Sequence, residues 1–216
     1  MVLTYSTFHE FNYNFSTVTL AFFNRYPNPY ATHVISADTI SQKIQDQKLY
    51  TTRLIRKNGR LPKFIMPFLG KVAESWIVEY SVVDPVNQTM KTWTSNLEHR
   101  GVLKVEEQTE YKAVVPTDIS NSNSSNHNNN NNNNNNKNAL MTAATYNVLF
   151  SSNFGRWGIR DRIESWSLSK FRENVQKSRR GMAYVMERMR EKGLTAFGEI
   201  QRQMSVVRDQ RELRDV

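Results

Sequence analysis

The positions of hydrophobic residues along the chain predict a series of β-strands followed by a long helix. β-Branched and aromatic residues favour strands over residues 4–12, 33–41, 49–57, 72–83, 89–97, 102–115 and 139–150. An apolar run favours a short helix over 15–24, and helical spacing of apolar residues continues from about 156 to 192. Grouped strands with a helix at the end are typical of the α+β class. We therefore expect a curved seven-stranded antiparallel sheet gripping a long C-terminal helix.

Local sequence signals define the ends of the short helix and the two faces of one strand. Asn14 or Ser16 can cap the first turn of the short helix, and Pro27 and Pro29 stop it. The strand over 72–83 alternates with a period of two. One of its faces takes Trp76, Val78, Tyr80 and Val82, and the other takes Glu79 and Ser81.

An apolar loop over 58–70 interrupts the strands. Its two prolines and two glycines, at 59, 62, 67 and 70, exclude a lasting helix or a central strand. Exposed loops are normally polar, yet this one contains Leu61, Phe64, Ile65, Met66, Phe68 and Leu69. Such a loop either packs back on the core or covers something removable.

A low-complexity segment over 120–138 contains an unbroken asparagine run from 128 to 136. Polar tracts of this kind cannot bury enough apolar surface to fold, so we interpret it as a disordered inserted loop. The predicted organisation is one domain over 1–192, interrupted at 120–138, with a charged C-terminal extension over 193–216.

The long helix carries a stripe that is apolar at both ends and polar in its middle. Steps of three and four residues place one set of side chains on a common face. The set is Ile163, Trp166, Lys170, Asn174, Lys177, Gly181, Val185 and Met189. Two buried lysines would need an anionic partner, because an unpaired buried charge costs several kcal/mol. The alternatives are that they face solvent as ordinary surface charge, or that they pair with an acidic residue from a strand.

Three other residues could join a cationic site. Arg25 precedes the proline-stiffened turn over 26–30, His33 begins the next strand, and Lys57 ends a strand where the apolar loop begins. Two of the three, Arg25 and His33, also have a structural interpretation. An aromatic and proline-rich turn is often architectural, and a lone histidine is more often a packed, hydrogen-bonded residue than a catalyst.

Charge and composition narrow the class of partner. The net charge is +9 and the pI about 9.8, with most of the excess in the C-terminal third, which favours an anionic partner. The chain has no cysteine, so disulfides and thiolate metal sites are excluded. Apolar runs fall short of the roughly 18–20 residues of a membrane span, and the N-terminus has neither a secretory signal nor a usual presequence.

Motifs for two rival classes are missing from the sequence. It has no zinc-finger spacing and no RNP-type aromatic motif, which weakens a nucleic-acid-binding interpretation based on charge alone. It also has neither Gly-x-Ser-x-Gly nor His-Glu-x-x-His, and its four histidines are scattered, which disfavours a hydrolase.

Short segments spread along the chain resemble the PRELI-like family. They are residues 25–34, 52–54, 59–62, 76–79, 96–97 and 105–107, and in the C-terminal helix 166, 170–171, 174–175, 177–179 and 181–182. Together the resemblance covers about residues 1–115 and 145–190, and it is strongest to the family's fungal phosphatidic acid carrier. The asparagine tract and the region after about 192 depart from the family pattern.

This resemblance implies a function as well as a fold. It implies an internal lipid cavity beside the long helix and transfer of phosphatidic acid from the outer to the inner mitochondrial membrane, supporting cardiolipin synthesis. It implies residence in the intermembrane space, peripherally on the inner membrane, and a heterodimer with a small helical-hairpin protein carrying twin cysteine motifs. Phosphatidic acid would be the bound ligand, with no cofactor and no catalysis. Phosphatidylserine transfer by the same fold is an alternative, and a basic nucleic-acid-binding protein is a more distant one.

Matched positions also imply roles for individual residues. The expected head-group ligands are Arg25, His33, Lys57, Lys170, Asn174 and Lys177. The expected lid and membrane-contact residues are Arg60, Leu61, Lys63, Phe64, Ile65 and Phe68. Neither a catalytic nor a metal-binding residue is expected.

Overall fold

The computed structural model describes residues 2–58, 66, 74–98, 100, 103–114, 141–151 and 157–191. Its strands are β1 (Val2–Phe11), β2 (Val34–Gln45), β3 (Lys48–Asn58), β4 (Glu74–Asp84), β5 (Thr89–Asn96), β6 (Lys104–Val114) and β7 (Met141–Ser151). Its helices are α1 (Phe15–Phe23) and α3 (Trp157–Glu191). The seven predicted strands and both predicted helices are thereby confirmed, with ends that differ by a few residues.

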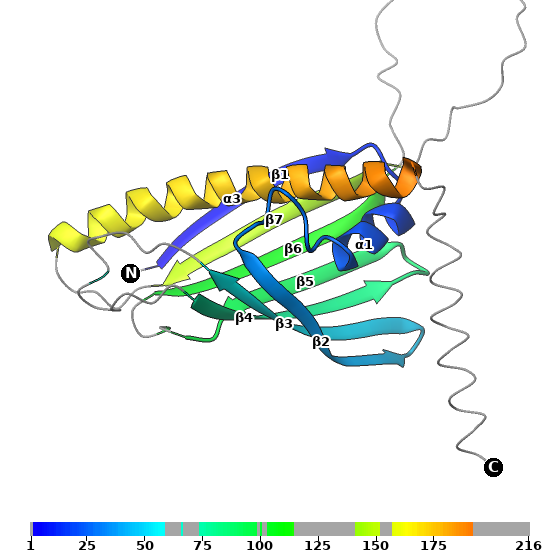
Figure 1. Ribbon diagram of the computed structural model, residues 1–216, viewed down its shortest axis with the longest axis horizontal. Helices are drawn as coiled ribbons and strands as arrows, with labels where there is room; N and C mark the ends of the chain where they lie inside the picture. The colour runs from blue at the N-terminus through cyan, green and yellow to red at the C-terminus, as the bar shows by residue number, and fades with distance from the viewer. Residues whose placement is uncertain are drawn as a thin grey trace, which may run out of the picture.

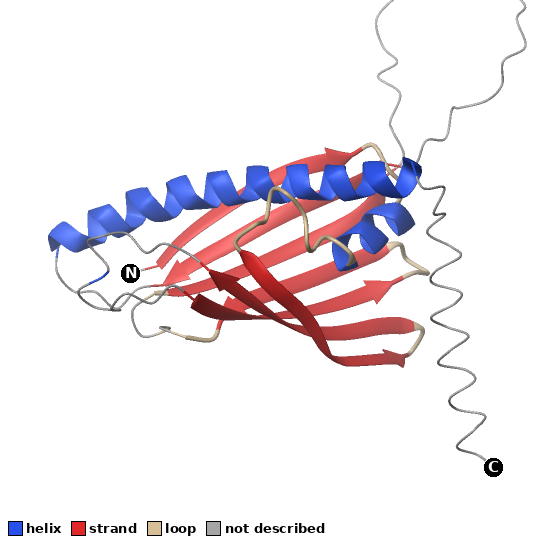
Figure 2. Cartoon of the chain, viewed as in Figure 1, coloured by secondary structure: helices blue, strands red, loops and turns tan. Residues whose placement is uncertain are grey.

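The seven strands form one open antiparallel sheet in the order β1-β7-β6-β5-β4-β3-β2. β1 therefore pairs with the last strand at one edge, while β2 begins a meander at the other edge. Both helices lie on the same face of the sheet (Figures 1 and 2). The connection from β1 to β2, which includes α1 and residues 24–33, consequently has to pass over that covered face. This crossing brings its polar side chains into the interior.

Helix α1 begins where a cap was expected. The Asn14 side chain accepts a hydrogen bond from the Thr17 backbone N–H at 2.8 Å, so Asn14, and not Ser16, is the N-cap. The helix is largely buried between the sheet and α3, through residues such as Val18 and Phe22. Because α1 is buried, the segment that follows it begins in the interior of the domain.

Two apolar clusters lie between α3 and the sheet. The larger joins α1 and the sheet to the C-terminal half of the helix, through Met182 and Met186. The smaller contains Val148, Phe150, Phe171 and Val175. Burying side chains of this size contributes about 1.5–3 kcal/mol each, so both clusters hold the helix on the sheet.

The face of α3 that contacts the sheet is shifted from the predicted stripe. Its buried residues are Ser167, Phe171, Val175, Gly181, Met182, Val185, Met186 and Met189. The apolar C-terminal end of the predicted stripe is confirmed, but its middle is wrong: Phe171 and Val175 are buried, whereas Lys170 and Asn174 lie at the margin of the face. One residue turns a helix by about 100°, which is enough to move a side chain from the centre of a face to its side.

The covered face of the sheet is unexpectedly polar in its centre. In β4, Glu79 is 1% exposed whereas Tyr80 is 51% exposed, so the predicted alternation holds but its polar face is the inner one. Neighbouring strands continue this polar band, because Arg53 pairs with Glu79 and Thr92 with Thr109 in the strand register. A buried band of this kind needs internal partners or a ligand.

Within the described segments, no helix combines the length and apolar character that a membrane span requires.

Candidate functional site

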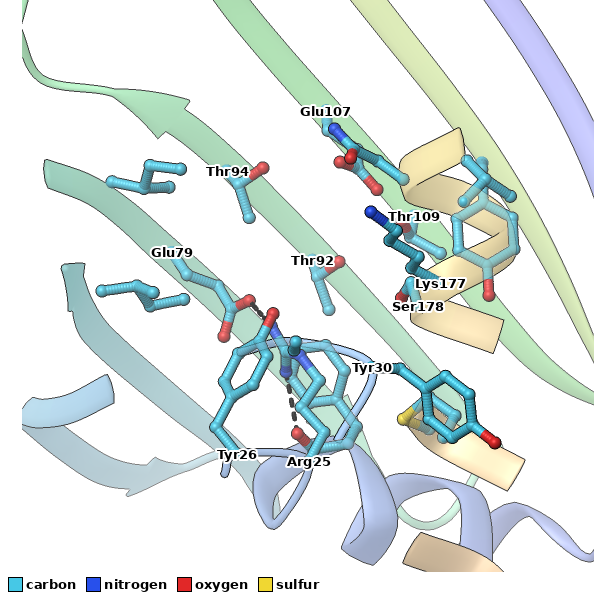
Figure 3. Close-up of a pocket in the computed structure, with 18 of the residues that line it drawn as sticks. Arg25, Tyr26, Tyr30, Glu79, Thr92, Thr94, Glu107, Thr109, Lys177 and Ser178 are labelled. Atoms are coloured by element: carbon cyan, nitrogen blue, oxygen red, sulfur yellow. Dashed lines mark hydrogen bonds and ion pairs between the residues drawn. The ribbon is translucent and has the colours of Figure 1, made fainter. Parts of the chain in front are cut away.

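A pocket of about 130 Å³ lies where the polar band, the segment after α1 and helix α3 meet (Figure 3). Residues from four sources line it. The sheet supplies Lys57, Glu79, Thr92, Thr94, Glu107 and Thr109; the segment after α1 supplies Arg25, Tyr26, Tyr30 and His33; α3 supplies Asn174, Val175, Lys177 and Ser178; and α1 supplies Phe22. Its wall is thus rich in charged and hydroxyl groups on a sheet face that is otherwise covered.

Five of the six predicted head-group residues line this pocket: Arg25, His33, Lys57, Asn174 and Lys177. Backbone pairing brings two of them together, because the Asn58 N–H donates to the His33 carbonyl oxygen at 2.7 Å. That bond joins the start of β2 to the end of β3, beside Lys57. The spatial grouping of these five residues is therefore a property of the fold, while their role toward a ligand stays a prediction.

Lys170, the sixth residue, lies outside the lining and is tied to its own helix. The Glu173 carboxylate bridges Lys170 and Lys177, with both Nζ atoms 2.6 Å from its oxygens. The two lysine side chains are 44% and 47% exposed. Of the alternatives for these lysines, the solvent-facing one is thus confirmed and the buried one is wrong, and their acidic partner comes from α3 rather than from a strand. Hydrogen bonds from Lys170 and Lys177 hold the pKa of Glu173 at about 2, so it is ionised at neutral pH.

Arg25 has the opposite environment, because it is buried and paired within the interior. Its guanidinium forms an ion pair with Glu79, donates to the Phe22 carbonyl oxygen at 2.8 Å and lies 3.9 Å from the centre of the Phe22 ring. Arg53 contacts the same carboxylate, with Nε 2.8 Å from Glu79 Oε1. One carboxylate therefore serves two guanidinium groups, and the cluster keeps one excess positive charge beneath the pocket.

The pKa shifts within this cluster follow from mutual charge stabilisation. Burial by itself would raise the pKa of Glu79, but Arg25 and Arg53 outweigh it and the pKa falls. Burial would likewise lower the pKa of Arg25, yet Glu79 and Tyr26 raise it above its ordinary value. The pKa of Arg53 instead falls, because burial and the charge of Arg25 outweigh the effect of Glu79. A guanidinium is not deprotonated at neutral pH, so all three groups are charged.

Four titratable groups in the lining have pKa values shifted toward their neutral forms: His33, Glu107, Tyr111 and Tyr146. Burial, followed by the positive charges of Lys57 and Lys177, lowers the pKa of His33. Burial raises the pKa of Glu107, although Lys57 and Arg25 oppose that change. Deeper in the pocket, burial raises the pKa of Tyr146 to about 12, so its hydroxyl stays protonated. The lining thus combines cationic side chains with groups whose neutral forms are favoured by burial.

Several lining residues were not anticipated from the sequence. They are Glu79, Thr92, Thr94, Glu107 and Thr109, together with Arg53 behind them. Each lies on the inner side of a strand, at alternating positions such as 79 and 81 or 107 and 109. A signal was present, because polar residues recur with a period of two in strands whose other face is also partly apolar. The described residues contain no group of three His, Cys, Asp or Glu side chains that could hold a metal ion.

The predicted lid residues, Arg60, Leu61, Lys63, Phe64, Ile65 and Phe68, lie outside the described residues. The asparagine tract over 120–138 and the extension over 193–216 also lie outside them.

Comparison with known proteins assigns the family. The model of the PRELI-like family matches residues 16–192, which is most of the chain. The chain belongs to the PRELI-like family. The resemblance drawn from short segments is thereby confirmed, and the matched residues include strands β2 to β7 and helix α3 of this PRELI-like protein.

Several relatives resemble this PRELI-like chain over most of its length. It is 46% identical over 192 residues to Protein UPS1, mitochondrial, of Saccharomyces cerevisiae, covering 88% of this chain and 97% of the relative. It is 36% identical to the ups1 homolog of Schizosaccharomyces pombe, covering 82% and 91%. It is 32% identical to human PRELI domain-containing protein 1, mitochondrial, covering 78% and 68%. Two of these three relatives are named as mitochondrial proteins, which places the chain in mitochondria.

Solved structures show the same fold at low sequence identity. TTHA0849 from Thermus thermophilus aligns with a TM-score of 0.50 and 11% identity, covering 85% of this chain and 97% of that one. The Zhui aromatase/cyclase from Streptomyces sp. R1128 aligns with a TM-score of 0.52 and 9% identity, covering 89% and 99%. A curved sheet with one long helix across it is therefore shared with proteins outside the family.

Proposed function

We propose that this protein is a phospholipid carrier that moves phosphatidic acid from the outer to the inner mitochondrial membrane. One observation carries the proposal: Arg25, His33, Lys57, Asn174 and Lys177 converge on one pocket. Arg25 contributes the excess charge of its buried cluster, and Lys177 can exchange Glu173 for a phosphate oxygen. Membership of the PRELI-like family supports lipid transfer in mitochondria as the general activity.

The acyl chains need an apolar environment beyond the head-group pocket. Val175 lines the pocket and also belongs to the apolar cluster with Val148, Phe150 and Phe171. At about 0.8 kcal/mol per buried methylene, two long chains represent more than about 20 kcal/mol of apolar burial. The pocket volume of about 130 Å³ suits a head group and not two chains. In this proposal the acyl chains extend from the pocket along this cluster, between α3 and the sheet.

Residence in the intermembrane space, peripherally on the inner membrane, is part of the same proposal. So is a heterodimer with a small helical-hairpin protein that carries twin cysteine motifs. Delivery of phosphatidic acid to the inner membrane would supply cardiolipin synthesis. In this proposal the protein binds and releases its cargo without changing a covalent bond, as a carrier and not an enzyme.

A liposome transfer assay tests the proposal through two lysines of the pocket. We expect Lys57→Ala and Lys177→Ala to reduce phosphatidic acid transfer by about tenfold or more when combined, because a charge-assisted contact to phosphate contributes about 1.5–3 kcal/mol. Lys91→Ala is the matched control, since Lys91 projects from the outer side of β5 and pairs with Glu110. Full transfer by the double variant would reject the assignment.

Phosphatidylserine is the second candidate cargo, and Glu107 is the observation that favours it. An ionised carboxylate in the lining could accept the ammonium group of a serine head group. The same assay with phosphatidylserine in the donor liposomes compares the two cargoes directly. Faster transfer of phosphatidylserine than of phosphatidic acid would replace the first proposal with the second.

A further inference from the structure

Glu107 occupies an unusual position for an acidic residue. It lies on the inner face of β6, opposite Thr94 of β5 and Val148 of β7 in the strand register. It is directed into the pocket, like Thr94 and Thr109 (Figure 3). A half-buried carboxylate in a site that is otherwise suited to anions requires an explanation, because the charged form would repel an anionic ligand.

The other acidic residues near the pocket are neutralised, whereas Glu107 is not. Glu79 is bridged by Arg25 and Arg53, and Glu173 is bridged by Lys170 and Lys177. Among the residues that the structure describes, no Lys, Arg or His nitrogen lies within 4.0 Å of the Glu107 carboxylate. Glu107 is thus the acidic group of this lining whose ionisation has the least local support.

We propose that Glu107 binds the phosphate head group in its protonated form, so that loading of the carrier is coupled to the uptake of one proton. This inference rests on the proposed function and concerns the same pocket. A protonated carboxyl donates an O–H hydrogen bond to a phosphate oxygen, whereas an ionised one repels it. The bound phosphate in turn favours the protonated carboxyl, and this reciprocity is what couples the two events.

The groups that face Glu107 set the direction of the pH dependence. Burial is the main cause that raises its pKa, and Glu79 of β4 adds to it, whereas Lys57 of β3, Arg25 and a hydrogen bond with Thr109 lower it. Helix α3 presents Lys177, already paired with Glu173, and the segment before β2 presents His33. Tyr111 and Tyr146 remain neutral because burial raises the pKa of both hydroxyls. Affinity for phosphate should therefore rise as pH falls through the pKa of Glu107 in the complex, and level off below its pKa in the free protein.

Two other titrations overlap with this one and have to be separated from it. Protonation of His33 would add positive charge and would also strengthen binding at acidic pH. A phosphate monoester takes up its own proton with a pKa of about 6, which weakens its attraction to the cations. A direct count of protons in Glu107 and His33 variants distinguishes the three contributions.

The test is calorimetric titration of the full chain with dihexanoyl phosphatidic acid in two buffers of different ionisation enthalpy. The buffer difference gives the number of protons taken up on binding. We expect about one proton for the wild-type protein and for Glu106→Gln, and nearly none for Glu107→Gln. Glu106 is the matched control, since it lies next in the same strand and pairs with Lys104. Above neutral pH, Glu107→Gln should bind several-fold more tightly than wild type.

Each outcome of the titration either supports or overturns the role proposed for Glu107. The titration is repeated over a series of pH values, because uptake is confined to the range between the pKa of Glu107 in the free protein and that in the complex. Wild-type binding without proton uptake at every pH of the series overturns the inference, and this result does not depend on the folding of any variant. Uptake that persists in Glu107→Gln but disappears in His33→Gln assigns the proton to His33 and also overturns it. Loss of phosphatidylserine binding in Glu107→Gln, with phosphatidic acid unaffected, would show that the ionised carboxylate holds an ammonium group instead. If the wild-type chain binds no phosphatidic acid, the proposed function fails together with the inference.

Discussion

Two clusters in this molecule have the same charges in opposite surroundings. In one, Glu79 bridges Arg25 and Arg53 beneath the pocket; in the other, Glu173 bridges Lys170 and Lys177 at its rim. Each consists of one carboxylate and two cations, and each leaves one positive charge in excess. The first is buried by α1 and the sheet, whereas the second is open to solvent on α3.

The difference in burial gives the two clusters different uses. Breaking a buried ion pair leaves a charge that water cannot solvate, so the Glu79 cluster is expected to stay intact and to provide a fixed field. An exposed ion pair contributes little to stability and exchanges partners easily. Lys177 can therefore leave Glu173 for a ligand at small cost. The comparison predicts that changes in the Glu79 cluster affect folding and that changes in the Glu173 cluster affect binding.

The largest expected effect is on stability, from Glu79→Gln. Removing the shared carboxylate charge leaves two buried guanidinium groups uncompensated, and we expect a loss of about 3–5 kcal/mol in the free energy of unfolding. Urea denaturation followed by circular dichroism measures this change. Glu173→Gln is the companion variant and should leave the urea midpoint unchanged. Equal shifts in both variants would remove the distinction between the clusters.

A smaller loss of stability is expected at Gly181, where helix α3 contacts the turn that carries Arg25. A Cβ atom at this position of α3 would lie 2.9 Å from Asn28 Nδ2. Asn28 cannot move freely, because its amide donates to the Arg25 carbonyl oxygen and accepts from the Tyr30 N–H at 2.8 Å. Overpacking costs about 1–3 kcal/mol, and replacing glycine in a helix returns up to about 1 kcal/mol. Gly181→Ala should therefore destabilise the protein by about 1 kcal/mol in thermal or urea unfolding.

A double-mutant cycle isolates the cause. In an Asn28→Ala background the overlap is removed, so Gly181→Ala should become neutral or stabilising. The same loss in both backgrounds would show that the contact with the turn that carries Arg25 is not responsible.

Much of the fold was predictable because it depends on local periodicity. Alternation of period two located each strand, and the polar Asn14 before Phe15 located the start of α1. The face of α3 was harder to predict. Two adjoining lines of side chains, one through Lys170 and Asn174 and the other through Phe171 and Val175, both follow helical spacing. Only the sheet against which the helix packs decides between them.

The site was predictable in part, for a related reason. Arg25, His33 and Lys57 meet because the connection from β1 to β2 crosses the sheet, and family resemblance, not periodicity, indicated them. Glu79 and Glu107 were missed because a pattern-based interpretation turns the apolar face of a strand inward. Here the inner face is the polar one. The free-energy cost of burying its charged groups is offset by ion pairs between residues distant in the sequence, such as that of Glu79 with Arg25. A local sequence pattern cannot reveal such compensation between distant residues.

The smallest expected effect concerns binding, and it tests the other half of the comparison. Glu173→Gln frees Lys177 from its carboxylate partner, so binding of phosphatidic acid should become about two- to fivefold tighter, the range that corresponds to a surface ion pair. Calorimetric titration with dihexanoyl phosphatidic acid measures this gain. Glu187→Gln makes the same change in net charge on the same helix, where Glu187 pairs with Arg190 and not with a lysine of the pocket rim. An equal gain in that control would mean that net charge alone, screened beyond about 8 Å at physiological salt, accounts for the effect. A gain confined to Glu173→Gln would instead show that the ion pair with Glu173 competes with the ligand for Lys177.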